Sequence, residues 1–442
     1  MTLQVLLDQT SNFLWGLIVD WVAFVSLFLT LGLGFLPLRQ LGFALHQTWR
    51  SLHRSEGKGT LSIFAALMTA LGGNVGTGSL AGIAVMLSIG GPGSLFWMWV
   101  ITLVSLATKY SEVMLAVRFR STNDRGELVG GPMYVMREGL PQSLRWLGLC
   151  FAAIASLACF GLGNGVQASE LANALEDSLG LPRLLSGVLL AAIVLVVIQG
   201  GVRRISRVSV VLVPLMVAGY LGFTGLILLT HLETLSKVLR TVVNDVFSSQ
   251  ALVGGSLLLM ISVAVHRTIT AEESGMGTTP IVHALTRPGD PVMQGLVAIL
   301  GNLVTALVAT MTALLVLCSE SHQGVFAQQS GFPMVIRAFD WGLPGSAWVL
   351  DLVTVLFSFT TVIVFAYYGE RCLEYLFGSR SNRVYRLVWA AVLVLAATRD
   401  FSEIWVATDI LNGLMVLPNL AALVLLSGTV FGLSKAYRFG RS

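Results

Sequence analysis

Long apolar segments recur along the whole of this 442-residue chain, and they constrain its fold more than any other feature. A helix needs about 20 predominantly apolar residues to cross a bilayer, and these segments reach that length. Only 11% of the residues are charged and 55% are hydrophobic, whereas a soluble domain carries roughly 25% charged residues. The sequence therefore predicts an all-α integral membrane protein. We place about eleven spans, at residues 14–36, 62–88, 91–117, 147–171, 184–200, 207–230, 250–285, 292–318, 346–377, 385–398 and 403–433.

Positive charge predicts the orientation of these spans. Most of the 27 lysines and arginines fall in alternate loops, beginning with the loop at 37–60. Cytoplasmic loops of membrane proteins carry this excess of lysine and arginine. We therefore expect an outside N-terminus, a cytoplasmic C-terminus and a multi-pass protein of the plasma (inner) membrane. The net charge of +4 then comes from residues in the loops between the spans, and it does not indicate binding to nucleic acid.

The second predicted span contains an interruption that a simple membrane helix would not have. Residues 69–82 read TALGGNVGTGSLAG, with five glycines beside Asn74, Thr77 and Ser79. Glycine weakens a helix, and unwound backbone inside a membrane is tolerated only where it faces protein or a watery cavity. Close helix packing through small residues is the alternative explanation. The added polar side chains favour a broken helix that binds a ligand.

A second interruption lies five spans later. Residues 268–279 read TITAEESGMGTT, which places two carboxylates inside an apolar segment. Because five is odd, the two broken helices belong to five-helix units of opposite orientation. Paired broken helices in an inverted repeat indicate the binding site of a secondary transporter. We predict one membrane domain over 1–442, with an extra helix and a cytoplasmic loop at 1–60, a first repeat at 61–230 and a second repeat at 250–433.

Other classes of function find less support. The four cysteines, at 150, 159, 318 and 372, have no metal-ligand spacing. The sequence contains no nucleophile elbow and no paired catalytic motif, so we do not predict an enzyme. The N-terminus lacks the basic and small-residue pattern of a signal peptide. An ion channel remains an alternative, because broken helices also build selectivity filters.

Several longer stretches resemble the alanine/glycine:cation symporter family, from about residue 60 onward. They lie in the family's order and read GTGSLAGIAVMLSIGGPGSLFWMWV (76–100), ATKYSEVMLAV (107–117), GGPMY (130–134), GNGVQA (163–168), GVRRISRVSVVLVPLM (201–216), ESGMGTTPIVHA (273–284), YYGERCLEYLFG (367–378) and DILNGLMVLPNL (409–420). The resemblance implies the leucine-transporter fold, with a 5+5 inverted repeat in helices 2–11 after one extra helix. It also implies a symporter that imports a small neutral amino acid with sodium, or with protons instead.

The resemblance further implies which residues form the site. The amides of Thr77 and Gly78 would hold the substrate carboxylate at the start of the second half-helix. Oxygen ligands suit a hard cation, and the implied sodium ligands are the carbonyls of Gly72 and Val75 and the hydroxyls of Thr360 and Thr361. Ser79 is a candidate contact for a second cation. The predicted substrate-binding set is Asn74, Gly76, Thr77, Gly78, Gln167, Glu272, Gly275, Met276 and Phe365.

Three departures from the family's pattern bear on the substrate. The family usually has small residues before VGTGN, but Asn74 stands here and Ser79 replaces the final asparagine. The family usually reads SNEAGMG, so Glu272 replaces an amide with a carboxylate. Phe365 stands where a tryptophan is usual. The substrate within the small neutral amino acids therefore stays open, as do its stereochemistry and the oligomeric state.

The role of Glu272 also has alternatives. It would pair with a substrate ammonium, add charge to a sodium site, or take up a proton and become the coupling group. Arg267 lies five residues before it, and a buried arginine needs a partner. We expect Arg267 to pair with Glu272 or with the neighbouring Glu273.

Overall fold

The computed structural model describes residues 3–53, 60–247, 256–287, 289–322, 331–399 and 402–438. Almost all of this chain is helical, as the sequence predicted. The elements of the first half are α1 (Leu3–Gly32), α2 (Leu36–Arg39), α3 (Leu41–His53), α4 (Ile63–Asn74), α5 (Thr77–Gly90), α6 (Gly93–Arg118), β1 (Ser121–Thr122), β2 (Leu128–Val129), α7 (Pro132–Gly139), η1 (Gln142–Leu144), α8 (Trp146–Phe160), η2 (Gly161–Gly165), α9 (Val166–Leu179), α10 (Arg183–Gln199) and α11 (Gly201–Thr230).

The second half begins with the helix α12. Its elements are α12 (Leu232–Val246), α14 (Ser256–Glu272), α15 (Pro280–His283), α16 (Pro291–Cys318), α17 (Phe332–Gly342), α18 (Ala347–Phe377), α19 (Ser381–Ala397), α20 (Ser402–Leu425) and α21 (Ser427–Ala436). β1 and β2 form a short antiparallel hairpin in which Ser121 pairs with Val129. Part of the predicted span 250–285 lies outside the described residues.

Local sequence signals set several helix ends. The Ser62 hydroxyl accepts a hydrogen bond from the Ala65 amide and caps α4, and the Asp290 carboxylate caps α16 through the Met293 amide. Both side chains satisfy amides that a helix start leaves unpaired. At the other end, Gly91 follows α5 with φ +69°, a conformation that glycine adopts at little cost. The chain can therefore turn directly from α5 into α6.

Seven stretches of the described chain are long and apolar enough to cross a membrane. They are Leu6–Gly32, Gly93–Arg118, Gln142–Leu179, Gly201–Thr230, Pro291–Cys318, Trp348–Phe377 and Trp405–Leu425. The bent pair α4 and α5 makes an eighth if it is one span. Three more predicted spans coincide with α10, α14 and α19, which have 17 residues each. That length is at the short end for crossing a bilayer, so the count of eleven stays a prediction.

The structure changes some predicted boundaries. The last predicted span, 403–433, is two helices, because α20 ends at Leu425 and α21 begins at Ser427. The span at 147–171 belongs to a longer helical stretch from Gln142 to Leu179, which contains a π-helical turn at GLGNG. The region after 230, which lies outside the predicted spans, contains the amphipathic helix α12. Its apolar residues recur at helical spacing, and it packs against α6 and α16.

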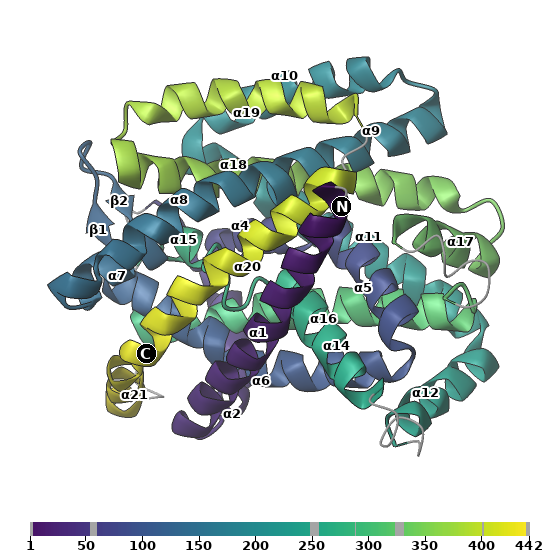
Figure 1. Cartoon of the computed structure of the whole chain (residues 1–442), viewed down its shortest axis with the longest axis horizontal. Coiled ribbons are helices and arrows are strands. Elements are labelled where there is room, and N and C mark those ends of the chain that lie inside the picture. The colour runs from purple at the N-terminus through teal and green to yellow at the C-terminus, as the bar shows by residue number, and fades with distance from the viewer. Residues whose placement is uncertain are drawn as a thin grey trace.

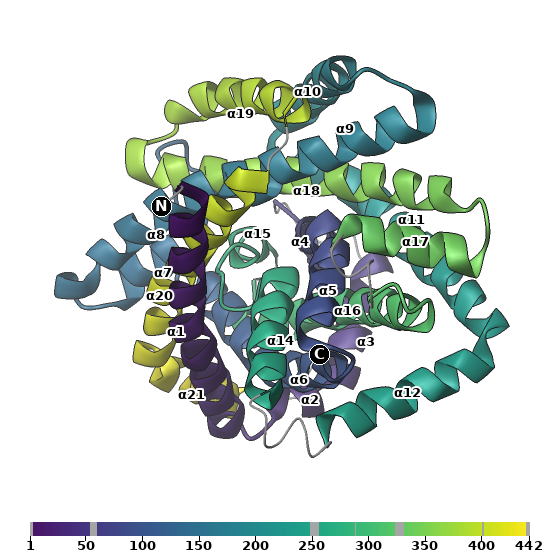
Figure 2. The same ribbon diagram turned by 45° about the vertical axis from the view of Figure 1, so that its right-hand side comes forward.

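The two interrupted segments lie at the centre of the molecule (Figures 1 and 2). α14 packs against α5 and α6, and α16 packs against α4, α5 and α6. Around this centre, α18 packs against α8, α9 and α11, while α10 and α19 pair at one edge. α1 packs along α20, and both begin at the end of the molecule where the N-terminus is marked (Figure 1). Segments far apart in sequence thus surround both breaks.

Candidate functional site

The first break separates α4 from α5, whose axes differ by 49°. α4 ends at Asn74, Val75 leaves the helical conformation, and Gly76 is extended before α5 begins at Thr77. This agrees with the break expected at NVGTGS. The Ser79 hydroxyl donates to the Gly76 carbonyl over 2.6 Å. The break therefore exposes α5's first amides and α4's last carbonyls to neighbouring helices.

Gln167 from α9 meets the start of α5. Its Oε1 accepts from the Thr77 hydroxyl at 3.0 Å and from the Thr77 amide at 3.4 Å. Its Nε2 donates to the Leu162 carbonyl, which lies in the π-helical turn before α9. An oxygen atom thus already occupies the position in front of the Thr77 donors. A carboxylate oxygen would find the same donors, strengthened by the positive end of the α5 helix dipole.

On the opposite side of the break, α18 reaches the end of α4. The Thr361 hydroxyl lies 3.2 Å from the Gly72 carbonyl oxygen and 3.5 Å from that of Gly73. The Thr360 hydroxyl lies 3.0 Å from the Phe357 carbonyl within its own helix. Val75 and both threonines are buried. The structure thus brings together two of the predicted sodium ligands, the Thr361 hydroxyl and the Gly72 carbonyl, and such oxygen atoms suit a hard cation. None of the described hydrogen bonds joins Val75 or Thr360 to them, so these two ligands stay predictions.

The second break follows α14 and is held by charged side chains of α6. Glu273, Gly275 and Gly277 all have positive φ, so the chain is fully unwound there. The Lys109 ammonium donates to the Glu273 carbonyl and to the Thr279 hydroxyl, each over 2.7 Å. One helical turn further on α6, the buried Glu112 accepts from Asn419 of α20 at 2.5 Å. Buried charges need such partners, and here they fix an irregular backbone.

A single side chain joins the two breaks. The Asn74 amide nitrogen, at the end of α4, donates to the carbonyl oxygen of Glu272 at the end of α14 over 3.0 Å. The Asn74 Oδ1 atom is buried without a hydrogen-bond partner in the described structure. Asn74 is therefore a bridge between the interrupted helices, with one acceptor left for a ligand.

The Glu272 carboxylate points away from Thr77 and Gln167. Its oxygens accept from Thr102 and Ser105 of α6 at 2.5 and 2.9 Å, and from Asn302 of α16 at 3.1 Å. The expected pairing with Arg267 is wrong, because no ion pair among the described residues joins Arg267 to Glu272 or Glu273. A change of backbone direction after α14 turns Glu273 toward Thr278 instead.

Arg267 lies one to two turns earlier on α14, near Asp409 of α20. Asp409 also accepts from His266 at 3.1 Å and from Ser11 at 3.0 Å. Asp409, and not a carboxylate of the break, therefore supplies the charge opposite Arg267.

Three other predicted substrate residues have contacts elsewhere. Gly275 faces Leu420 of α20, since a Cβ there would lie 3.2 Å from a Leu420 methyl. Phe365 packs against Gly163, where a Cβ would collide with it, and against Tyr368. Met276 is fully buried. None of the described hydrogen bonds or ring contacts brings these residues to Thr77, so their predicted role in substrate binding stays a prediction.

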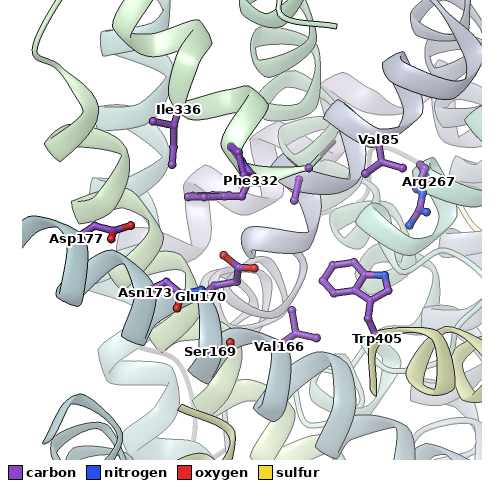
Figure 3. Close-up of a pocket in the computed structure, with 13 residues that line it drawn as sticks. Val85, Val166, Ser169, Glu170, Asn173, Asp177, Arg267, Phe332, Ile336 and Trp405 are labelled. Carbon is purple, nitrogen blue, oxygen red and sulfur yellow. The ribbon is translucent and has the colours of Figure 1, made fainter. Parts of the chain in front are cut away.

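A cavity of about 520 Å³ lies beside the first break, on the side predicted to face outward. Ala81 and Val85 of α5 line this cavity. Val166 of α9, the residue before Gln167, also lines it. Figure 3 shows Val166, Ser169 and Glu170 along one wall, with Arg267 and Trp405 across from them. The cavity thus approaches the Thr77–Gln167 contact from one side of the molecule.

Sequence reasoning missed the residues that support the second break. Lys109 and Glu112 lie in ATKYSEVMLAV, which was used only for its resemblance to a family. Two opposite charges three residues apart in a membrane span are costly unless they have partners, and that cost was an available signal. Asn302 and Asn419 each lie in an apolar helix that contains one other amide side chain, and only the fold reveals what they contact.

The comparisons with known proteins identify the family of the chain. The sequence matches the model of the sodium:alanine symporter family over residues 1–441. The sodium/alanine symporter AgcS of Methanococcus maripaludis is 34% identical over 438 residues, covering 98% of this chain and 96% of that protein. An uncharacterized transporter of Haemophilus influenzae is 35% identical over 446 residues, covering 99% of this chain and 96% of that protein.

A solved structure also shares the fold. The crystal structure of an Eremococcus coleocola manganese transporter, in complex with an aromatic bis-isothiourea substituted compound, matches with a TM-score of 0.51. The two chains are 12% identical, and the match covers 87% of this chain and 94% of the other. At this identity the likeness concerns the fold alone. The match to the family over nearly the whole length, together with the relatives at 34% and 35% identity, shows that this multi-pass membrane protein belongs to the sodium:alanine symporter family.

Proposed function

We propose that this chain imports a small neutral amino acid, such as alanine or glycine, together with sodium by alternating access. The observation that carries the proposal is the first break, where two donor and acceptor sets meet side by side. Thr77 presents an amide and a hydroxyl to an oxygen of Gln167, and Thr361 approaches the Gly72 carbonyl. The first set suits a carboxylate and the second suits a cation.

In this proposal the substrate carboxylate binds at the start of α5. It takes hydrogen bonds from the Thr77 and Gly78 amides in place of the Gln167 oxygen. The unpaired Asn74 Oδ1 is then an acceptor for the substrate ammonium. Gly76 leaves room for the substrate, since a Cβ there would lie 2.8 Å from the Thr361 hydroxyl.

The coupling sodium lies on the α18 side of the same break. Its proposed ligands are the carbonyls of Gly72 and Val75 and the hydroxyls of Thr360 and Thr361. The Thr361 hydroxyl hydrogen now points at the Gly72 carbonyl, so binding requires it to rotate and turn a lone pair to the ion. Ser79 is engaged with the Gly76 carbonyl, and a second cation contact there needs the same rotation.

The wider arrangement completes the proposal. We assign eleven spans, with helices 2–11 as a 5+5 inverted repeat of the leucine-transporter type and one helix before them. The N-terminus lies outside the plasma membrane and the C-terminus in the cytoplasm. The 520 Å³ cavity then leads from the outside toward Thr77. Membership of a symporter family favours this carrier over the channel considered from sequence.

Uptake into proteoliposomes tests the proposal. Radiolabelled alanine and glycine are supplied with an inward sodium gradient, and then with an inward proton gradient alone. We expect accumulation only with sodium, and we expect Thr361→Val to need a much higher sodium concentration for the same uptake. Uptake driven by protons alone would favour the second candidate, a proton-coupled carrier that uses Glu272, a carboxylate only 2% exposed. Absence of uptake under both gradients would contradict the proposed substrates.

A further inference from the structure

Glu272 lies in a second oxygen-rich cluster that is separate from the Thr360–Thr361 side of the first break. α6, α14 and α16 pack against one another around it (Figure 2). Each of these helices contributes two oxygen-bearing side chains spaced three or four residues apart, and such pairs share one helix face. The six residues, which we call the Glu272 cluster, are Thr102, Ser105, Thr268, Glu272, Asn302 and Thr305.

All six side chains are buried, with at most 3% of their surface exposed. Three oxygens of the cluster have no hydrogen-bond partner in the described structure: Thr268 Oγ1, Asn302 Oδ1 and Thr305 Oγ1. Thr268, Thr305 and Glu272 line one small void, and the rest of its lining is apolar. An unpaired buried polar atom costs about 1–3 kcal/mol, so three of them around one carboxylate require an explanation.

The chemistry of these unpaired atoms indicates what they bind. Each can offer a lone pair, and a cation accepts lone pairs from several oxygens at once. Thr102 donates its hydrogen to Glu272, and the single hydrogen of Ser105 faces both Glu272 and the Thr102 carbonyl. The lone pairs of both hydroxyls stay available. The cluster contains one carboxylate among neutral oxygens, a charge that suits a monovalent ion. Calcium sites usually contain more carboxylates.

The surrounding charges also favour a cation. Lys109 faces Glu112, Glu272 and Glu273 from the next turn of α6, and its ammonium is already bound to the Glu273 carbonyl and Thr279. Three carboxylates and one ammonium carry a net charge of −2 when all are ionised. A buried excess of negative charge is costly, and a bound cation reduces it.

We propose that the Glu272 cluster is a second sodium site, formed between α6, α14 and α16. The proposal extends the sodium coupling proposed above, and it is testable without any amino acid. Because the Glu272 carbonyl accepts from Asn74, an ion in the cluster acts on the same residue that joins the two breaks. The site therefore links sodium binding at α14 to the substrate site at α5.

Binding of radioactive sodium to the purified protein in lipid nanodiscs tests the site. We expect two sodium ions per wild-type chain, one per chain in Glu272→Gln, and one per chain in Thr361→Val. Thr305→Val and Thr268→Val remove unpaired hydroxyls at nearly constant volume. Each substitution should lower the affinity for the second sodium ion about tenfold, which corresponds to losing one contact of about 1.4 kcal/mol.

Thr270→Val is the matched control on the same helix. The Thr270 hydroxyl bonds to the His266 carbonyl at 2.8 Å, outside the cluster, so sodium binding should not change. If Glu272→Gln does not fold, the two valine variants decide the question. Replacing these unpaired hydroxyls with methyl groups should not reduce folding, because the substitution removes no hydrogen bond within the protein.

The outcomes separate this site from the proposed symport. One sodium per wild-type chain that survives Glu272→Gln and both valine variants would refute the second site and leave the first intact. If acidification has the effect at Glu272 that we assign to sodium, the cluster binds a proton. That result would also refute the proposal. One sodium that is lost in Glu272→Gln but kept in Thr361→Val would support this site and refute the other. Amino-acid uptake, measured in parallel, tests symport independently.

Discussion

Replacing Gly76 with alanine tests the predicted substrate and sodium sites together, because Gly76 lies between them. Its backbone has φ −117° and ψ −177°, an extended conformation open to any residue. A Cβ there would lie 2.8 Å from Thr361 Oγ1 and 3.4 Å from Gln167 Oε1. The substitution therefore fills the space between two proposed ligand-binding side chains without straining the chain.

The expected magnitude follows from these distances. The contact at 2.8 Å is far inside the roughly 3.5 Å at which carbon atoms and their neighbours attract. Overpacking of this kind costs about 1–3 kcal/mol. Each 1.4 kcal/mol changes an equilibrium constant tenfold. If Thr361 and Gln167 relieve the contact by moving, the apparent affinities for sodium and for amino acid should fall by about 10- to 100-fold.

The assay is sodium-driven uptake in proteoliposomes, with the sodium and alanine concentrations varied in turn. Gly82→Ala on the same helix is the control, because a Cβ there would lie 3.8 Å from the Arg267 side chain, an ordinary contact. Alanine inside a helix is also more favourable than glycine by about 0.5–1 kcal/mol. We expect Gly82→Ala to transport like the wild type and to melt at an equal or higher temperature.

Wild-type uptake by Gly76→Ala, with unchanged dependence on sodium and alanine, would refute the reasoning. It would mean that neither Thr361 nor Gln167 has to keep its position for transport. Loss of sodium affinity alone would assign Thr361 to the site and remove Gln167 from it. Loss of amino-acid affinity alone would give the reverse assignment.

Three further predictions concern other contacts. Thr361→Val should raise the sodium concentration for half-maximal uptake at least tenfold; an unchanged sodium dependence would contradict the assigned ligand set. Lys109→Met leaves buried carboxylates without their cation, so it should destabilise the protein by about 3–5 kcal/mol; thermal unfolding of the purified variant checks this, and wild-type stability would argue against the contacts to Glu273 and Thr279. Asp124→Ala removes the contact of the β1–β2 hairpin with Ser379 over 2.7 Å, and amide hydrogen exchange of residues 121–129 should become faster, with transport measured separately.

The first break could be read from the sequence, because its cause is local. Four glycines and three polar residues within 72–79 weaken a membrane helix at that point. The motif also predicted which backbone atoms would lack a partner within their helix, because a break before Thr77 exposes the first amides of the following helix. Only the positions of Gln167 and Thr361 needed the family resemblance, and the structure does bring both to the break.

The direction of Glu273 could not be read in the same way. Glu272 and Glu273 are adjacent, and the backbone reverses at Glu273 with φ +52°. Glu273 follows the last residue of α14, so helical spacing does not predict its neighbours. Arg267 and Glu272 both lie within α14, but they are five residues apart and so lie on different faces of the helix. Glu272 therefore meets α6 and α16, and its expected partner Arg267 meets α20. The supporting charges on α6 were visible in the sequence, but their partners, one backbone carbonyl and two side chains, belong to other segments.

The contact between the breaks gives a physical reason why ion binding would affect substrate binding. Asn74 is the last residue of α4 and bonds to the last residue of α14, so neither helix end can shift without disturbing the other. The proposed first sodium lies against α4 and α18, whereas the proposed second lies against α14, α6 and α16. Each ion would fix one side of the Asn74 bridge. A substrate that needs both helix ends in place would then bind more tightly after both ions, and by linkage it would strengthen their binding by the same factor.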